Sequence, residues 1–142
     1  MKIEEKSLDA LHAHAAGGYP DAVCGVLLGP PAQPDSVTKV VAVANRESDA
    51  PSVRYRIAPA DWLRVQGAAH EEGLEIVGFY HSHPGGPEQP CDSDRRIAAQ
   101  VLADGVFHIV IGVGDEGKTT SGAFVFRTTL QGFQPVPLDV IP

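Results

Sequence analysis

Hydrophobic positions along the chain recur with two different periods, and these periods predict where strands and helices lie. Short apolar runs rich in β-branched and aromatic residues predict strands, whereas apolar positions three or four residues apart predict helices. The run at residues 74–80 (LEIVGFY) is expected to form a buried central strand. It leads directly into His81-Ser82-His83-Pro84 and then into a loop rich in proline and glycine.

The same patterns predict strands before and after the central one. A short strand is expected at residues 2–5. Further strands are predicted at residues 22–29, 37–44, 52–57, 106–113 and 122–127, with a last short one at residues 133–136. The segments between these runs contain Pro, Gly, Asp, Asn and Ser, which favour turns and loops.

Helical spacing predicts three helices, at residues 7–16, 59–72 and 92–103. Ser7 is expected to cap the first helix, and Pro59 suits the first turn of the second. Trp62 is expected to pack in the core. The buried face of the third helix is predicted to consist of Ile97, Ala98, Val101 and Leu102.

The order of these elements predicts the fold class. Helices and strands alternate along the chain, which favours an α/β architecture with a single mixed β-sheet flanked by helices. A length of 142 residues suits one domain with one sizeable core, so we expect a single domain over residues 1–142. Ligands of such sheets collect at the C-terminal ends of strands, which is where His81 and His83 lie.

Candidate chemistry is concentrated at the end of the central strand. Alternation along a strand places His81 and His83, two residues apart, on the same face. Asp94 follows eleven residues after His83, in the first turn of the predicted third helix. Two imidazole nitrogens and one carboxylate oxygen are three ligands for a tetrahedral Zn²⁺, with the fourth position left for water. These three residues are therefore the candidate zinc ligands.

Composition and charge exclude several classes of function. Hydrophobic residues make up 43% of the chain and charged residues 20%, as in ordinary soluble proteins. The formal net charge of −7 argues against nucleic-acid binding as the main task. No apolar run approaches the length of a membrane span, and the N-terminus lacks the apolar region of a signal peptide, so we expect no membrane association and a cytoplasmic location. The two cysteines give no disulfide framework.

The segment around the two histidines resembles the motif of a known family. His81-Ser82-His83-Pro84, followed by Pro90 and Asp94, is similar to the JAMM (MPN-plus) metalloprotease motif His-x-His-Pro…Pro-Ser-x-x-Asp. The run Cys24-Gly25-Val26-Leu27-Leu28-Gly29 also resembles the Cys-Gly-Leu-Leu-x-Gly strand of that family. On this resemblance the chain is identified as a small stand-alone bacterial member of the family. The resemblance implies the JAMM/MPN fold, which is similar to that of cytidine deaminases.

The resemblance implies a catalytic base at a position where this chain has none. In the family one glutamate, in the pattern Pro-x-Glu-x-Cys-Gly, acts as both general base and general acid. This chain has Pro20-Asp21-Ala22-Val23-Cys24-Gly25, so Ala22 stands at the position of the glutamate. Strand alternation points Asp21 to the opposite face, and we do not expect it to replace the base. Ala22 is either a natural feature of an inactive member or an engineered Glu→Ala substitution, and the surrounding family-like residues favour the engineered origin.

A second departure from the family pattern is Cys91, which stands where the family usually has serine. That serine hydroxyl would donate to the developing oxyanion and cap the helix that carries Asp94. A thiol is a weaker donor. Cys91 near a helix N-terminus is also a candidate nucleophile, but no histidine outside the metal pair is placed to act as its base. We therefore favour a simple replacement of serine.

The resemblance also implies a function and a partner. JAMM enzymes hydrolyse amide or isopeptide bonds after the C-terminal glycines of ubiquitin-like proteins, and the small bacterial members process ubiquitin-like or sulfur-carrier proteins of the ThiS/MoaD kind. The expected function is therefore a zinc-dependent peptidase that is impaired by Ala22. The alternative is a catalytically inactive, zinc-containing module that binds a Gly-Gly tail without cutting it. A deaminase would need a Cys-x-x-Cys pair, which Cys24 and Cys91 do not supply.

Overall fold

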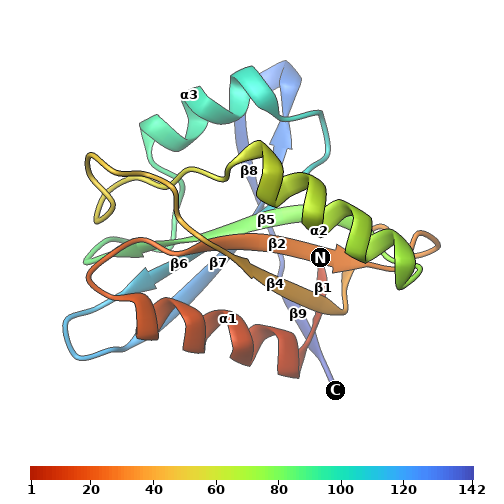
Figure 1. Ribbon diagram of the computed structural model, residues 1–142, viewed down its shortest axis with the longest axis horizontal. Helices are drawn as coiled ribbons and strands as arrows, with labels where there is room; N and C mark the ends of the chain where they lie inside the picture. Colours follow the sequence, from red (N-terminus) through yellow and green to blue (C-terminus); the bar gives the residue numbers. More distant parts are fainter.

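A six-stranded mixed sheet runs through the middle of the molecule (Figure 1). The computed structural model describes residues 1–142, except for the side chain of Val101. In spatial order the sheet consists of β4 (Lys39–Val43), β2 (Cys24–Gly29), β5 (Glu75–Pro84), β6 (Phe107–Val113), β7 (Thr119–Arg127) and β8 (Gly132–Val136). Strands β5 and β6 are parallel, and the other neighbours are antiparallel. The α/β class predicted from the sequence is confirmed.

A second, smaller sheet joins the two ends of the chain, so the expectation of a single sheet is wrong. It has the order β3 (Ser36–Val37), β1 (Lys2–Glu4) and β9 (Asp139–Ile141), and both pairings are parallel. These strands have only two or three residues each. Segments this short carry no readable alternation, and their pairing is determined by how the rest of the chain packs.

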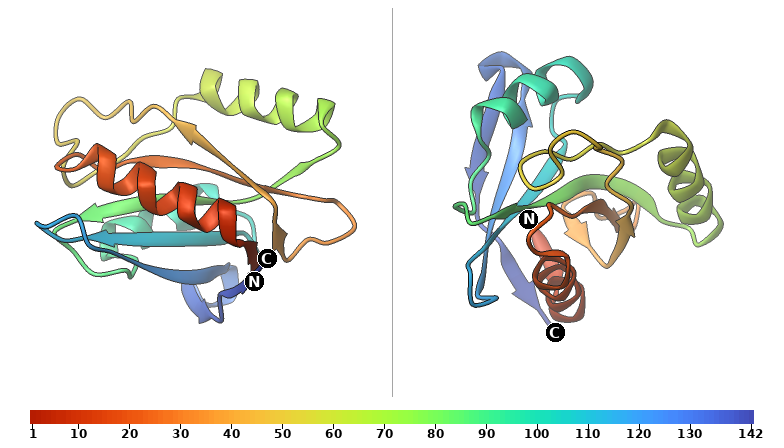
Figure 2. Two further views of the ribbon diagram at one scale, coloured as in Figure 1. Left: turned by 90° about the horizontal axis from the view of Figure 1, so that it is seen from below. Right: turned by 60° about the vertical axis from the view of Figure 1, so that its left-hand side comes forward.

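Helices cover both faces of the large sheet. The helix α1 (Glu5–Gly18) lies on one side, and α2 (Pro59–Glu71) and α3 (Asp92–Val101) lie on the other (Figures 1 and 2). None of the described helices combines the length and the hydropathy that crossing a membrane would require. Because helices cover both faces of the sheet, successive side chains of a strand point into two different hydrophobic cores. The core under α1 contains Leu11, Ala15, Leu27, Tyr80 and Ile109, and the core under α2 contains Val26, Leu28, Val65 and Ala69.

Three expectations about the helices are wrong. The first helix begins at Glu5 rather than Ser7, and Ser7 is buried inside it instead of capping it. Ile97 of α3 is 50% exposed because this short helix covers only the edge of the sheet, whereas Ala98 is buried as predicted. The predicted role of Val101 lies outside the described side chains. Trp62 is only half-buried, and it stacks on Phe79 with the ring centroids 5.2 Å apart.

The predicted strand at residues 52–57 is not formed. Residues 51–53 make a turn and residues 54–58 are irregular. The side chain of Asn45 takes the place of a neighbouring strand, since its Oδ1 accepts the N–H of Arg56 and its Nδ2 donates to the carbonyl of Arg54. The N–H of Arg46 also donates to the carbonyl of Arg56. One edge of this segment is therefore held by the preceding loop.

The ion pair between Arg46 and Asp61 fastens this loop to α2. Arg46 Nε lies 3.0 Å from Asp61 Oδ2, and the hydrogen bond from Arg46 holds the pKa of the Asp61 carboxyl below its ordinary value of 3.8. A lowered folded-state pKa adds stability above the ordinary value, and that stability is lost as the pH falls through the folded-state value. We expect Asp61→Asn to lower the thermal unfolding midpoint at pH 7.

The difference in midpoint between Asp61→Asn and the starting chain should shrink as the pH falls below 3.8. Thermal unfolding followed by circular dichroism at several pH values measures it. Asp49→Asn is the matched control, because Asp49 is exposed in the same loop and has no ion pair among the described residues. A midpoint difference that stays constant across the pH range would contradict the assignment to this ion pair.

Candidate metal centre

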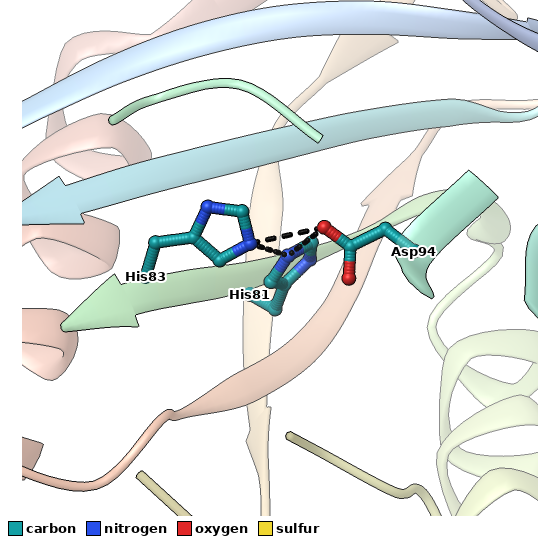
Figure 3. A group of neighbouring side chains, drawn as sticks. All are labelled: His81, His83 and Asp94. Carbon is teal, nitrogen blue, oxygen red and sulfur yellow. Dashed lines mark hydrogen bonds and ion pairs between the residues drawn. The ribbon is translucent and has the colours of Figure 1, made fainter. Parts of the chain in front are cut away.

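The last residues of β5 carry the two candidate histidine ligands. The strand continues through Pro84, so His81 and His83 both lie within its last four residues. They are two residues apart, and their side chains point to the same face of the sheet (Figure 3). This is the face covered by α2 and α3. Ser82 points the other way, and its Oγ accepts the N–H of Val23. His81 is 1% exposed, whereas the His83 side chain is partly open to solvent.

The third candidate ligand comes from α3. Asp94 is the third residue of the helix, and its Oδ2 accepts the backbone N–H of Cys91 at 2.8 Å. Cys91 precedes the helix as its N-cap, and its sulfur faces the backbone N–H of Asp94 in return. This reciprocal capping box fixes the carboxylate at the start of α3, where it points to the two imidazoles (Figure 3).

The three ligand atoms form a nearly equilateral triangle. Nε2 of His81 and Nε2 of His83 are 3.0 Å apart, and they lie 3.1 Å and 3.0 Å from Asp94 Oδ2. All three corners of such a triangle can lie about 2.0–2.1 Å from one ion, which is the usual distance of Zn²⁺ to nitrogen and oxygen ligands. Among the described residues, this is the group of His, Cys, Asp and Glu side chains close enough together to hold a metal.

The hydrogen bonds around His83 test whether the residues suit a cation. Its Nδ1 lies 3.0 Å from the carbonyl oxygen of Pro87, which can only accept a hydrogen bond. In the neutral ring Nδ1 therefore carries the hydrogen, and Nε2 turns a lone pair towards the Asp94 carboxylate and the other imidazole. Lone pairs that converge in this way repel one another unless a proton or a metal cation lies among them. The donor set therefore fits a zinc ion.

The proton equilibria of the three side chains reflect their contacts. Burial lowers the pKa of His81, although Asp94 opposes this effect. Burial also acts to lower the pKa of His83, but the hydrogen bond to Asp94 outweighs it and the pKa is raised. For Asp94, burial alone would raise the pKa, but the hydrogen bonds from His81 and His83 hold it well below its ordinary value. Asp94 is thus a permanent carboxylate near neutral pH.

The loop after β5 is pressed against the neighbouring strands, which fixes the Pro87 carbonyl. A Cβ atom on Gly112 of β6 would collide with the carbonyl of Gly86, and one on Gly122 of β7 would collide with the carbonyl of Glu88. Glycine at these positions lets the loop backbone approach the sheet. The loop after β2, at residues 30–35, lies away from the candidate ligands, because Gly29 pairs with Glu75 at the opposite end of β5.

Ala22 lies beside the candidate ligands. Cys24 pairs with His81, and the N–H of Ser82 donates to the carbonyl of Val23, which continues the pairing by one residue. The side chain at position 22 therefore lies next to His83 and on the same face of the sheet. Ala22 is 4% exposed and is covered by the loop that contains Asn45 and Pro51. Asp21, in contrast, is exposed.

Neither cysteine has the surroundings of a reactive thiolate. Burial raises the pKa of Cys91 despite its place at the start of α3, and the nearby Asp94 carboxylate raises it further. Cys24 is buried, which raises its pKa to about 12, and its Sγ lies 3.6 Å from the carbonyl oxygen of Val43. These surroundings disfavour Cys91 as a nucleophile and are consistent with a replacement of serine.

Two residues of the site were missed or undervalued in the sequence. The ring of Tyr55 stacks on His81, with the centroids 4.6 Å apart and the planes 19° from parallel. His108 of β6 is buried, and its Nε2 lies 2.6 Å from His81 Nδ1. The sequence gives no signal for Tyr55. For His108 a signal exists only once β5 and β6 are known to be neighbours.

A cavity of about 410 Å³ adjoins the triangle on the side of α3. Its walls include Tyr55, Ile57, Phe79, Ile97, His108 and Phe133, and Asp94 also borders it. Most of this lining is apolar. The exposed Ile97 stands in its wall, so the cavity offers a place for an apolar side chain next to the candidate ligands.

Comparison with known proteins identifies relatives of the whole arrangement. A family model described as prokaryotic homologues of the JAB domain matches residues 4–127. A desampylase of Haloferax volcanii is 36% identical over 106 residues, which cover 70% of this chain and 73% of that protein. A CysO-cysteine peptidase of Mycobacterium tuberculosis is 31% identical over 100 residues, which cover 70% of this chain and 66% of that protein. Tail tip assembly protein K of Escherichia phage N15 is 32% identical over 108 residues, but the chain spans only 40% of its length.

Solved structures share the fold. A protein from Salinibacter ruber is 28% identical with a TM-score of 0.75, and the match covers 99% of this chain and 92% of that one. A JAB1/MPN domain protein from Archaeoglobus fulgidus matches with a TM-score of 0.59 at 19% identity over the full length of both chains. A structure described as a metalloprotease-like zinc site of the JAMM type in the proteasome and signalosome matches with a TM-score of 0.57 at 18% identity, over 100% of this chain and 98% of that one.

Proposed function

We propose that this chain, which belongs to the prokaryotic JAB branch of the JAMM/MPN family, is a zinc-dependent peptidase or isopeptidase domain in a form that lacks its general base. Its substrate class is a ubiquitin-like or sulfur-carrier protein that ends in Gly-Gly, with cleavage after the second glycine. The observation that carries the proposal is the convergence of His81 Nε2, His83 Nε2 and Asp94 Oδ2 within 3.1 Å of one another.

The proposed substrate class is based on the activities that the names of two relatives describe. The Haloferax protein is a desampylase and the mycobacterial protein a CysO-cysteine peptidase, and both names describe removal of a group from another molecule. The identity of 31–36% extends over 70% of this chain. Similarity to these relatives favours hydrolysis of the bond that follows the C-terminal glycines of a small protein over deamination. The candidate ligand set, which contains no cysteine, favours the same choice.

Each residue of the site has a distinct task under this proposal. His81, His83 and Asp94 would hold the ion, and the Pro87 carbonyl would keep the His83 ring in the required tautomer. A bound Zn²⁺ supplies Lewis-acid polarisation of the scissile carbonyl and a lowered pKa of water. The Tyr55 ring covers one face of His81 and excludes water from it. Cys91 stands at the mouth of the site, where its S–H is a weak donor to the carbonyl oxygen that gains charge.

The segment Tyr55–Ile57 supplies an edge for an extended tail. The carbonyl of Arg54 and both backbone groups of Arg56 bond to Asn45 and Arg46, and the N–H of Arg54 donates to the carbonyl of Ala50. Tyr55 and Ile57, in contrast, have no backbone partner within the described part of the chain. An extended peptide can pair with such an edge by β-augmentation. The cavity beneath Ile57 would receive an apolar side chain of the tail, and glycine at the cleavage point would let the backbone approach the ion.

A second candidate function is a binding module that does not cut. Ala22 favours it, because an alanine beside His83 cannot carry a proton. Both candidates need the same metal and bind the same tail. They differ only in whether hydrolysis appears once a base is supplied at position 22.

Binding of the tail can be tested with the chain as it stands. Isothermal titration calorimetry of the zinc-loaded chain should detect a ubiquitin-like protein that ends in Gly-Gly. Removal of the two glycines should weaken binding by roughly tenfold or more, since each lost main-chain hydrogen bond is worth about 1 kcal/mol. Elemental analysis should find one zinc per chain. Equal binding of the full-length and shortened proteins would exclude recognition of the tail.

A further inference from the structure

His108 forms a contact of unusual chemistry with a candidate metal ligand. It lies on β6, next to Phe79 of β5 in the parallel register, and its side chain shares the face of His81. Its Nε2 is 2.6 Å from Nδ1 of His81, and the two ring planes are 70° apart. Both rings are buried, with His108 only 3% exposed. The contact is therefore a hydrogen bond between two imidazoles that are shielded from solvent.

The direction of this hydrogen bond follows from the position of the ion. His81 turns Nε2 towards His83 and Asp94, so Nε2 must offer its lone pair when a metal is present. In the neutral ring the hydrogen then lies on Nδ1 and is donated to His108 Nε2. A neutral imidazole has one nitrogen without a hydrogen, and Nε2 of His108, 2.6 Å from His81 Nδ1, is placed to accept this hydrogen.

We propose that His108 is a positioning residue for the metal centre: by accepting the Nδ1–H of His81 it fixes the tautomer and the orientation that present His81 Nε2 to the ion. The inference rests on the proposed zinc site and adds a residue to it. Metal-binding histidines generally donate their second N–H to a carboxylate, a carbonyl or a water. Here the acceptor of that hydrogen is a second histidine, His108.

The surroundings of His108 argue that packing alone does not account for an imidazole at this position. The ring lies between aromatic neighbours, with Phe79 and Phe133 at centroid distances of 6.5 Å and 5.4 Å. A phenyl ring would suit this apolar setting better. Moreover, Nδ1 of His108 is buried and has no hydrogen-bond partner among the described residues. An unpaired buried nitrogen costs stability, and among the described residues the hydrogen bond to His81 is the one that the His108 ring makes.

The proposal distinguishes two variants of His108. His108→Phe keeps an aromatic ring between Phe79 and Phe133 but leaves the Nδ1–H of His81 without an acceptor. His108→Gln supplies a side-chain oxygen that can accept the same hydrogen. We expect His108→Phe to weaken zinc binding by about 10–100-fold and His108→Gln to restore most of the affinity. Zinc affinity is measured by competition with a chromophoric chelator at fixed pH.

The matched control is His14→Phe. His14 of α1 also donates or accepts a hydrogen bond next to β5, with its Nδ1 2.8 Å from the hydroxyl of Tyr80, but on the opposite face of the sheet. Its loss should leave zinc affinity unchanged. The unfolding midpoint of each metal-free variant shows that it is folded before affinities are compared.

A spectroscopic measurement tests the tautomer directly. Nitrogen-15 NMR of the zinc-loaded chain should find His108 protonated at Nδ1 and unprotonated at Nε2, which a merely structural histidine has no reason to prefer. Two results would overturn the proposal: His108→Phe that binds zinc as tightly as the starting chain, or His108 protonated at Nε2 in the zinc-loaded state. If the starting chain itself binds no zinc, the metal centre fails, and this outcome is distinct from a failure of His108 alone.

Discussion

The Ala22→Glu variant is expected to cleave a ubiquitin-like fusion after its Gly-Gly sequence about 10²–10⁴ times faster than the chain with alanine. A positioned carboxylate can take a proton from the attacking water and hand it to the leaving amine. Alanine can do neither. The assay separates the products by gel electrophoresis, and mass spectrometry identifies the bond that is cut.

The position of residue 22 supports this expectation. The pairing of Val23 with Ser82 sets residue 22 beside His83, on the face of the sheet that carries the three candidate ligands. Ala22 is 4% exposed, so a glutamate side chain there would start from a buried Cα and extend towards the partly open side of His83. Partial burial raises the pKa of a carboxyl group, and a general base works best when its pKa is close to the pH of the reaction.

Ala22→Gln is the control for this experiment. Glutamine has nearly the size of glutamate but cannot accept a proton at neutral pH, so this variant should bind zinc and remain as slow as the starting chain. Equal rates for the glutamate and glutamine variants would show that side-chain size and not proton transfer matters. Zinc bound by every variant with cleavage by none would favour the binding module over the peptidase.

The parts of the site that local patterns specify could be predicted from the sequence. Alternation in a single strand brings His81 and His83 to one face, and the first turn of a helix fixes Asp94, so both features depend on neighbouring residues only. The remaining contacts depend on which segments become neighbours. His108 reaches His81 because β5 and β6 pair in parallel, and nothing near either residue in the sequence encodes that pairing.

Side-chain hydrogen bonds account for the other differences between prediction and structure. The apolar positions of residues 52–57 suggest a strand, but Asn45 uses both ends of its amide to hold Arg54 and Arg56, and no described strand pairs with this segment. Because Asn45 bonds to Arg54 and Arg56 and not to Tyr55, the Tyr55 side chain can stack on His81. A side chain that substitutes for a strand has no periodic signature, so pattern analysis cannot detect it.

Replacement of Asp94 by asparagine is expected to reduce zinc affinity by at least about 100-fold, because loss of a hydrogen-bond partner of a ligand already costs about 10–100-fold and this change removes a ligand charge. Asparagine keeps an oxygen that can accept the N–H of Cys91, so the start of α3 should remain folded. The change removes the negative charge that attracts the cation and that pairs with His81 and His83.

Metal removal gives a second measure of the same effect. An ion that binds only the folded chain raises its stability by an amount that grows with concentration over Kd. A chelator should therefore lower the thermal unfolding midpoint of the starting chain and leave that of Asp94→Asn unchanged. Asp92→Asn is the matched control, since Asp92 lies two residues away in α3, is 66% exposed and pairs only with Arg95 and Arg96 among the described residues. Its response to the chelator should equal that of the starting chain. If Asp94→Asn kept the zinc affinity and the chelator response of the starting chain, Asp94 would not be a ligand, and the ion would have to be held by His81 and His83 with a different third group.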